Sequence, residues 1–192
     1  CKEICEQTAI KLTEQNVGKL FVSNIKSSTL MVHAHLRGGA DNSGKLVAQV
    51  KKIAKTLAKK HGKQFVIVDG SPGIGCPVIS SLSGASYVVL VTEPTLSGFH
   101  DLKRVHSLVK KFHLPAAVII NKADLNRDVY QQITAWIKQE DIAFLADLPY
   151  DEAFTEAMIS AKTIVEYGDS VSSSTLRNCW SQLKTLIYKE QN

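Results

Sequence analysis

Residues 65–77, FVIVDGSPGIGCP, are the stretch that decides the fold of this chain. An apolar run, residues 65–68, leads directly into Asp69 and then into a turn rich in glycine and proline. A short run of this kind predicts a buried strand of a parallel sheet. Such a strand brings its carboxylate to the carboxyl edge of the sheet, where α/β proteins bind ligands, and in nucleotide hydrolases this carboxylate holds or orients hydrated Mg²⁺. The alternative interpretation is an aspartate that only caps the next element.

Outside this stretch, short apolar runs alternate with segments of helical periodicity. Strands are predicted at residues 20–23, 29–36, 86–91, 116–120 and 142–145. Helices are predicted at residues 43–61, 97–112, 127–139, 154–160 and 174–188. Strands that alternate with helices of about 10–15 residues indicate βαβ units. The predicted fold class is therefore α/β, with a mostly parallel sheet.

The composition is that of an ordinary globular chain, with 192 residues, 44% apolar and 21% charged. We expect no transmembrane segment, because no apolar run approaches the roughly 20 residues that span a bilayer, and no secretory signal. The net charge is +5, and seven lysines but no acid lie between Asp41 and Asp69. A solvated helix face explains this run better than a docking face for an acidic partner or a phosphate backbone. We do not expect nucleic acid as a partner.

The cysteines are few and unevenly spaced, which favours a reducing, cytoplasmic location. Because the chain opens at Cys1 in the middle of a motif, we expect it to be a fragment. Cys1-x3-Cys5 looks like the end of a ferredoxin run, although Glu6 replaces the usual proline. Two cysteines cannot hold a cluster alone, and the alternative is two unrelated cysteines. Cys76 is interpreted as a reactive thiol or metal ligand, or as a small buried residue in a turn, and Cys179 as a core residue.

The motif Asn121-Lys122-Ala123-Asp124 directly follows the predicted strand 116–120. At the carboxyl end of a strand, the amide of Asn121 can both donate to and accept from a purine edge. Asp124 can accept from the N–H donors of guanine. The alternative is a polar loop in which Asp124 caps the following helix. We favour the nucleotide interpretation because the motif lies downstream of Asp69 and after a buried strand.

Residues 39–45 match the phosphate-loop pattern G-x-x-x-x-G-K, but Leu46 stands where a serine or threonine should bind Mg²⁺. Without that hydroxyl the metal loses a ligand. We therefore interpret this segment as the start of a helix, with Asn42 or Ser43 as its cap.

Four stretches resemble the MinD/ParA/Mrp group of P-loop ATPases: residues 66–82, 91–105, 118–126 and 148–158. The match is best with the subgroup that carries an inserted ferredoxin domain and is often described as cobyrinic acid a,c-diamide synthase-like. The resemblance implies a three-layer P-loop NTPase-like fold. It also implies that residues 1–18 are the tail of a 4Fe-4S ferredoxin-like insert and residues 19–192 the carboxyl-terminal part of the ATPase domain. The phosphate loop of that family precedes the insert and is not in this chain.

The resemblance also assigns roles at the site. Asp69 takes the Walker B role toward Mg²⁺, and residues 70–75 the switch II role. The expected nucleotide-binding residues are Gly70, Pro72, Gly73, Thr92, Pro94, Asn121, Asp124, Pro149, Tyr150 and Asp151, with Glu93 in the same loop as Thr92. In that family Asn121 matches the adenine contact and residues 149–151 match a loop that closes over the base. In the more distant nitrogenase iron protein a cluster ligand matches Cys76, but its second ligand would fall near Asn42, which is not cysteine.

The expected function is ATP binding, with hydrolysis in the full-length protein, coupled to 4Fe-4S clusters so that it gates electron transfer or cluster handling. The expected cofactors are ATP and Mg²⁺, with 4Fe-4S clusters in the full-length protein. The expected partners are a second copy in a homodimer and a redox or cluster-accepting protein. A non-hydrolysing iron–sulfur scaffold is one alternative. A GTPase is the other, although the G-S-P-G that follows Asp69 does not give the D-x-x-G spacing.

The 192-residue chain alone is expected not to hydrolyse ATP, because Leu46 leaves the pattern at residues 39–45 without its Mg²⁺-binding hydroxyl. Phosphate release by the purified chain tests this expectation. Robust turnover that is lost in Lys45→Ala would show that residues 39–45 are a working phosphate loop after all.

Overall fold

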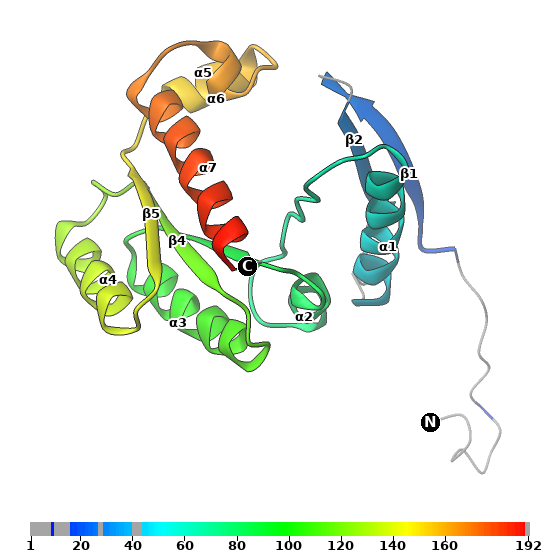
Figure 1. Cartoon of the computed structure of the whole chain (residues 1–192), viewed down its shortest axis with the longest axis horizontal. Helices are drawn as coiled ribbons and strands as arrows, with labels where there is room; N and C mark the ends of the chain where they lie inside the picture. Colours follow the sequence, from blue (N-terminus) through cyan, green and yellow to red (C-terminus); the bar gives the residue numbers. More distant parts are fainter. Residues whose placement is uncertain (1–8, 10–15, 27–28, 40–43, 191–192) are drawn as a thin grey trace. The chain divides into compact units, whose positions relative to one another are not determined.

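The computed structural model describes residue 9 and residues 16–26, 29–39 and 44–190 (Figure 1). Cys1 and Cys5, and the predicted helix caps Asn42 and Ser43, lie outside these described residues. The chain divides into two compact units, residues 1–69 and residues 70–192. The boundary expected near residue 18 stays a prediction, because most residues before it are not described. Each unit is considered by itself.

The first unit contains a β-hairpin and one helix. Its elements are β1 (Gly18–Ile25), β2 (Thr29–Leu36) and α1 (Gly44–Lys60). The strands pair antiparallel, with Val22 opposite Val32, and α1 packs along β2 (Figure 1). These elements confirm the predicted strands and helix.

The charged face of α1 is solvated, as expected, with one exception. Lys51 is buried, with 7% of its surface exposed. Burial lowers the pKa of the Lys51 ammonium, and the positive charge of Lys55 lowers it further. On β2, His33 and His35 share one side of the strand, where His33 stacks on Phe21. The described residues contain no group of three or more histidine, cysteine or acidic side chains that could hold a metal ion.

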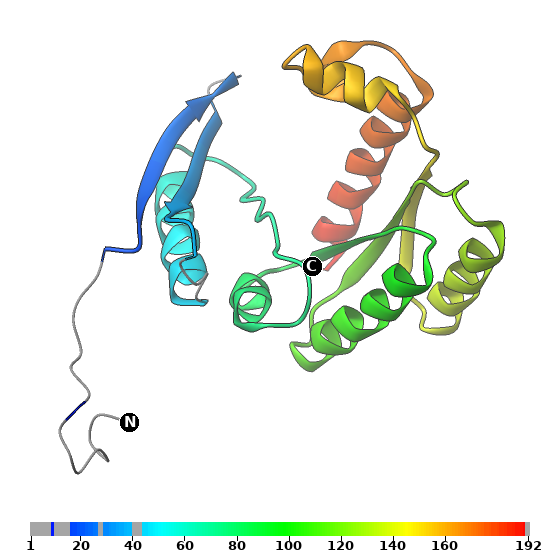
Figure 2. The same ribbon diagram turned by 180° about the vertical axis from the view of Figure 1, so that it is seen from behind.

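The second unit is a three-layer α/β structure around a parallel sheet of order β3-β4-β5. In chain order its elements are α2 (Cys76–Leu82), β3 (Val88–Thr92), α3 (Leu96–Lys111), β4 (Ala116–Asn121), α4 (Arg127–Gln139), β5 (Ala143–Leu148), α5 (Ala153–Ile159), α6 (Ile164–Tyr167) and α7 (Val171–Lys189). Figures 1 and 2 show α3 and α4 on one face of the sheet and α7 on the other. This arrangement confirms the predicted fold class.

The central strand β4 is buried on both faces because helices cover it from both sides. Val118 and Ile120 are fully buried and pack with residues of α3 and α4, among them Ile133. Ala117, from the opposite face of β4, packs with Cys179 of α7. Alternate residues of a strand point to opposite faces, so one short apolar strand supplies both cores. Cys179 is a core residue, as predicted, and burial raises the pKa of its thiol.

Residues 65–68 are not the buried strand that the sequence predicts. They belong to neither sheet of the described residues, and Ile67 is 81% exposed, with Val66 and Val68 each at 38%. A strand forms only where a neighbouring backbone completes its hydrogen bonds. The apolar run in the sequence indicates a strand but does not identify which segment would pair with it. Asp69, at the end of this segment, is also exposed.

Two short helices, α2 and α6, were not predicted. Their seven and four residues are too few for helical periodicity to show. Within the described part of the chain, no helix is both long and apolar enough to cross a membrane.

Ile133→Ala is expected to lower the free energy of unfolding by about 2–5 kcal/mol, because it leaves a cavity in the core between α4 and the sheet. Ile133 is fully buried, whereas Leu125 is 56% exposed, so Leu125→Ala is the matched control and should cost under about 1 kcal/mol. Urea denaturation followed by tryptophan fluorescence measures both, since Trp136 lies on the same helix. Equal losses would contradict the assignment of this core.

Candidate functional site

The carboxyl ends of β3, β4 and β5 lie side by side at one edge of the sheet. The register pairs Thr92 of β3 with Ile120 of β4, and Asn121 of β4 with Leu148 of β5. The residues that follow these strand ends are mostly polar or turn-forming, and five of them are predicted nucleotide-binding residues: Pro94, Asp124, Pro149, Tyr150 and Asp151. The structure therefore brings this subset of the predicted site together.

The turn between β3 and α3 is closed by internal hydrogen bonds, one of which is made by Thr92. The Thr92 hydroxyl donates to the Gly98 carbonyl at 3.1 Å, and the Thr95 hydroxyl accepts from the Gly98 N–H at 2.9 Å as the cap of α3. A Cβ on Gly98 would lie 2.5 Å from the Glu93 carbonyl oxygen, so this position accepts only glycine. Thr92 is 6% exposed and Pro94 is fully buried, and both shape the turn from inside.

An ion pair joins the loops that follow β3 and β4. The Lys122 Nζ lies 2.8 Å from Glu93 Oε1. The hydrogen bond to Glu93 and the negative charge of Glu93 raise the pKa of Lys122. Lys122 has a positive φ of 51°, a conformation that costs free energy in a residue other than glycine. The turn after β4 therefore has a conformation that its surroundings must hold in place.

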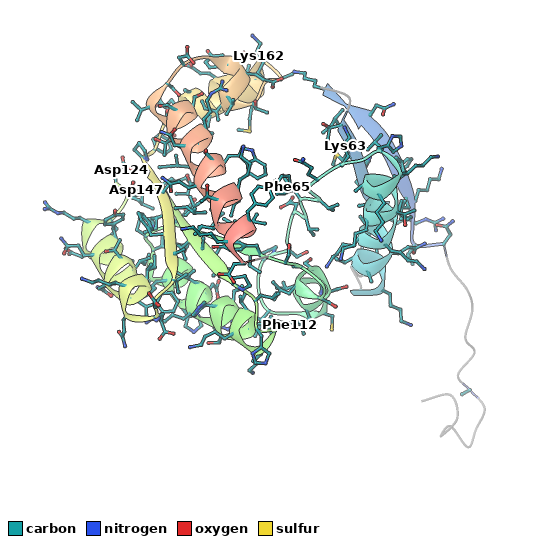
Figure 3. The ribbon with its side chains drawn as sticks, in the orientation of Figure 1. Lys63, Phe65, Phe112, Asp124, Asp147 and Lys162 are labelled. Atoms are coloured by element: carbon teal, nitrogen blue, oxygen red, sulfur yellow. The ribbon has the colours of Figure 1, made fainter. Side chains whose placement is uncertain are left out.

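The loop after β4 is also bound to the loop after β5. The Ala123 N–H donates to the Leu148 carbonyl at 2.8 Å, and Asp124 Oδ1 accepts from the Tyr150 N–H at 2.7 Å. Figure 3 shows Asp124 beside the carboxyl end of β5. These two bonds extend the contact between the chain segments beyond the last paired residues of the strands.

The alternative prediction that Asp124 caps the next helix is wrong. Asn126 is the cap of α4, because its Oδ1 accepts from the Val129 N–H at 3.0 Å. The sequence carries a signal for this cap: Asn126 stands immediately before the predicted helix start, and asparagine is among the best capping residues.

Asp151 ties the loop after β5 to the start of α7. Its Oδ2 accepts from the Ser172 hydroxyl at 2.6 Å, and its Oδ1 accepts from the Ala153 N–H at 2.9 Å. These hydrogen bonds, that of Ser172 foremost, lower the pKa of the Asp151 carboxyl. Ser172 is 1% exposed and was not among the predicted site residues. Its only sequence signal is the serine run at the start of α7.

Two predicted residues are left free to meet a ligand at this edge. The side-chain amide of Asn121 is half-buried and forms no hydrogen bond with any described residue. Tyr150 is held by its backbone N–H, whereas its side chain is 59% exposed. The edge therefore offers one amide and one aromatic ring on a framework whose other polar groups are already bonded.

The remaining predicted residues lie on the segment before α2. The unit boundary falls between Asp69 and Gly70, so the structure does not place Asp69 relative to the sheet edge. Gly73 has a positive φ of 86°, which glycine adopts without strain. Cys76 begins α2 and is exposed, so the alternative of a buried turn residue is wrong, and its role as a ligand stays a prediction.

Comparison with curated proteins identifies distant relatives, and no family model matches the chain. One uncharacterized protein of Methanocaldococcus jannaschii is 26% identical over 169 residues, which are 88% of this chain and 56% of that protein. A second uncharacterized protein of the same organism is 25% identical over 157 residues, 82% of this chain and 51% of the relative. The chain thus spans about half the length of the curated relatives it matches.

Comparison with solved structures identifies the fold. The cell division ATPase MinD of Pyrococcus furiosus matches with a TM-score of 0.58 and 21% identity, over 75% of this chain and 59% of that one. The septum site-determining protein MinD of Pyrococcus horikoshii, complexed with Mg-ADP, matches with a TM-score of 0.59 and 21% identity, over 77% and 59%. The MinD cell division protein of Aquifex aeolicus matches with a TM-score of 0.58 and 17% identity, over 70% of this chain and 60% of that one. The chain has the fold of MinD-type P-loop ATPases.

The pKa of Asp151 is expected to lie below its ordinary value of 3.8, because the hydrogen bonds of Ser172 and Ala153 favour the charged form. The contribution of Asp151 to stability is then present above pH 3.8 and is lost as the pH falls through the lowered pKa. Ser172→Ala should raise the pKa toward 3.8, as measured by carboxyl-carbon NMR titration. Ser174→Ala is the control, since the Ser174 hydroxyl donates to backbone carbonyls of α7 and its cap. An unchanged pKa in Ser172→Ala would contradict the assignment.

Proposed function

We propose that this chain is part of an ATP-binding and ATP-hydrolysing protein, and that the carboxyl edge of β3-β4-β5 holds the base of the nucleotide. The observation that carries the proposal is the free amide of Asn121 at the end of β4, beside the Tyr150 loop. Open α/β sheets bind ligands at the carboxyl ends of their strands. The fold is also that of MinD proteins, one of which was solved with Mg-ADP.

The phosphate side of the proposed site rests on Asp69 and residues 70–75. Asp69 is exposed at the end of an apolar segment, and an uncommitted carboxylate is a suitable ligand for Mg²⁺, which prefers oxygen donors. Bound Mg²⁺ would neutralise negative charge on the phosphates. Residues 70–75 would follow the state of the nucleotide, in the switch role that the family resemblance assigns, and Gly73, with its positive φ, is the residue that turns the backbone there. Asp69 remains the proposed catalytic residue.

We propose that parts of the full-length protein beyond these 192 residues complete the site. Within the described residues, β3 pairs with β4 alone, although its sequence VVLVT is as apolar as that of a central strand. Val91 of this strand is 65% exposed. Edge strands of natural sheets are usually shortened, charged or covered. We therefore propose that the sheet continues beyond β3 in the whole protein and that the phosphate loop comes with this continuation.

The proposed coupling to 4Fe-4S clusters rests on Cys1 and Cys5, with Cys76 as a further proposed ligand. The described residues do not fit a cluster, since no group of three possible metal ligands occurs among them and Cys76 is a single exposed cysteine. A ferredoxin module, a homodimer and a redox or cluster-accepting partner therefore remain proposals for the whole protein. The competing proposal, a non-hydrolysing iron–sulfur scaffold, differs in having no turnover.

Asp69→Asn in the full-length protein is expected to reduce Mg²⁺-dependent ATP hydrolysis to background while leaving the fold intact. The amide matches the carboxylate in shape but lacks the charge that Mg²⁺ requires. Phosphate release measures turnover, and circular dichroism checks the fold. Asp101→Asn is the matched control, because Asp101 is an exposed carboxylate on α3. Undiminished hydrolysis in Asp69→Asn would remove Asp69 from the site, and absence of hydrolysis in the unmodified protein would favour the scaffold.

A further inference from the structure

The loop that follows β5 is anchored from both sides by carboxylates. From one side Asp124 accepts the Tyr150 N–H. From the other, Asp151 accepts from Ser172 of α7 and from Ala153 of α5. Residues 149–151 are thus held between the turn after β4 and the helices that follow β5.

The sequence around Tyr150 explains why its N–H is the donor to Asp124. Pro149 has no backbone N–H, so Tyr150 carries the first N–H after the last residue of β5, Leu148. The Leu148 carbonyl is already bonded to the Ala123 N–H. The carboxylate of Asp124 then accepts the next available donor, as the carbonyl of a neighbouring strand would.

We propose that Asp124 is a positioning residue, which holds the loop of residues 149–151 in place through its contact with Tyr150 and does not read the nucleotide base. The inference rests on the proposed function, because the held loop is the one that would lie against the base. It assigns the N-K-x-D motif a structural role here, so a guanine preference does not follow from Asp124. Base selection then falls to Asn121 and to the backbone of the loop.

The proposal makes a sharp distinction between two substitutions of Asp124. Asparagine keeps an oxygen acceptor at the position of Oδ1 but removes the charge, whereas alanine removes the acceptor. A loop anchor needs only the acceptor. A guanine reader needs a carboxylate that accepts from two N–H groups of the base, so it fails in both variants. Asp128→Ala is the matched control, because Asp128 is an exposed carboxylate in the first turn of α4.

The first experiment measures amide hydrogen exchange at Tyr150 in the full-length protein without nucleotide. We expect protection in the unmodified protein, in Asp124→Asn and in Asp128→Ala, and faster exchange in Asp124→Ala. Equal exchange rates at Tyr150 in Asp124→Ala and in the unmodified protein would overturn the proposal that Asp124 holds this loop. This readout requires no nucleotide, so it stands even if the proposed function fails.

The second experiment measures ATP and GTP binding to the same four proteins by calorimetry. Asp124→Ala should weaken the binding of ATP and of GTP by the same factor, about 2- to 10-fold, which is the range expected for one hydrogen bond. Asp124→Asn should bind both nucleotides as the unmodified protein does. Selective loss of GTP in both variants would overturn the proposal and identify Asp124 as a guanine reader. If none of the proteins binds either nucleotide, the proposed function fails, and the statement that Asp124 does not read the base fails with it. The amide exchange experiment then decides alone whether Asp124 anchors the loop of residues 149–151.

Discussion

The parallel pairing of β4 with both β3 and β5 is the constraint on which the second unit depends. This pairing buries β4 on both faces, so that Val118 and Ile120 meet α3 and α4 while Ala117 meets α7. It also aligns three strand ends that are far apart in sequence. Because every strand runs in the same direction, the polar residues after each strand gather at a single edge. Without this pairing there would be neither a core nor a candidate site.

The polar contacts at that edge shape the site beyond the strands. The Lys122–Glu93 pair joins the loops after β3 and β4, and Asp124 joins the loop after β4 to that after β5. Such exposed contacts contribute little individually to stability. Their effect is geometric: they pair Lys122, Glu93 and Asp124 with groups of the protein and connect the three loops. The amide of Asn121 has no such partner among the described residues and is available to a ligand. This is the physical basis of the proposed nucleotide site.

Sequence patterns predicted the elements whose signals are local. The helix predicted at residues 127–139 has the bounds of α4, because amphipathic periodicity needs no partner to be recognised. The alternation of strands and helices predicted the fold class, in agreement with the resemblance to MinD-type ATPases. The N-K-x-D motif named Asn121 and Asp124, which lie at the end of β4 and in the loop that follows it. Sequence patterns failed where the local structure depends on a partner that is distant in the sequence. Residues 65–68 have the composition of a strand but no neighbour in either sheet of the described residues, and the bond between Asp124 and Tyr150 spans 26 positions of sequence.

The central claim is that the carboxyl edge of β3-β4-β5 holds the base of a bound nucleotide. Photolabelling of the full-length protein with 8-azido-ATP, followed by mass spectrometry of the digested product, tests it most directly. The account predicts that the label appears on the segments at residues 121–126 and 148–151 and that unlabelled ATP suppresses it. Labelling confined to other segments under the same competition would contradict the account.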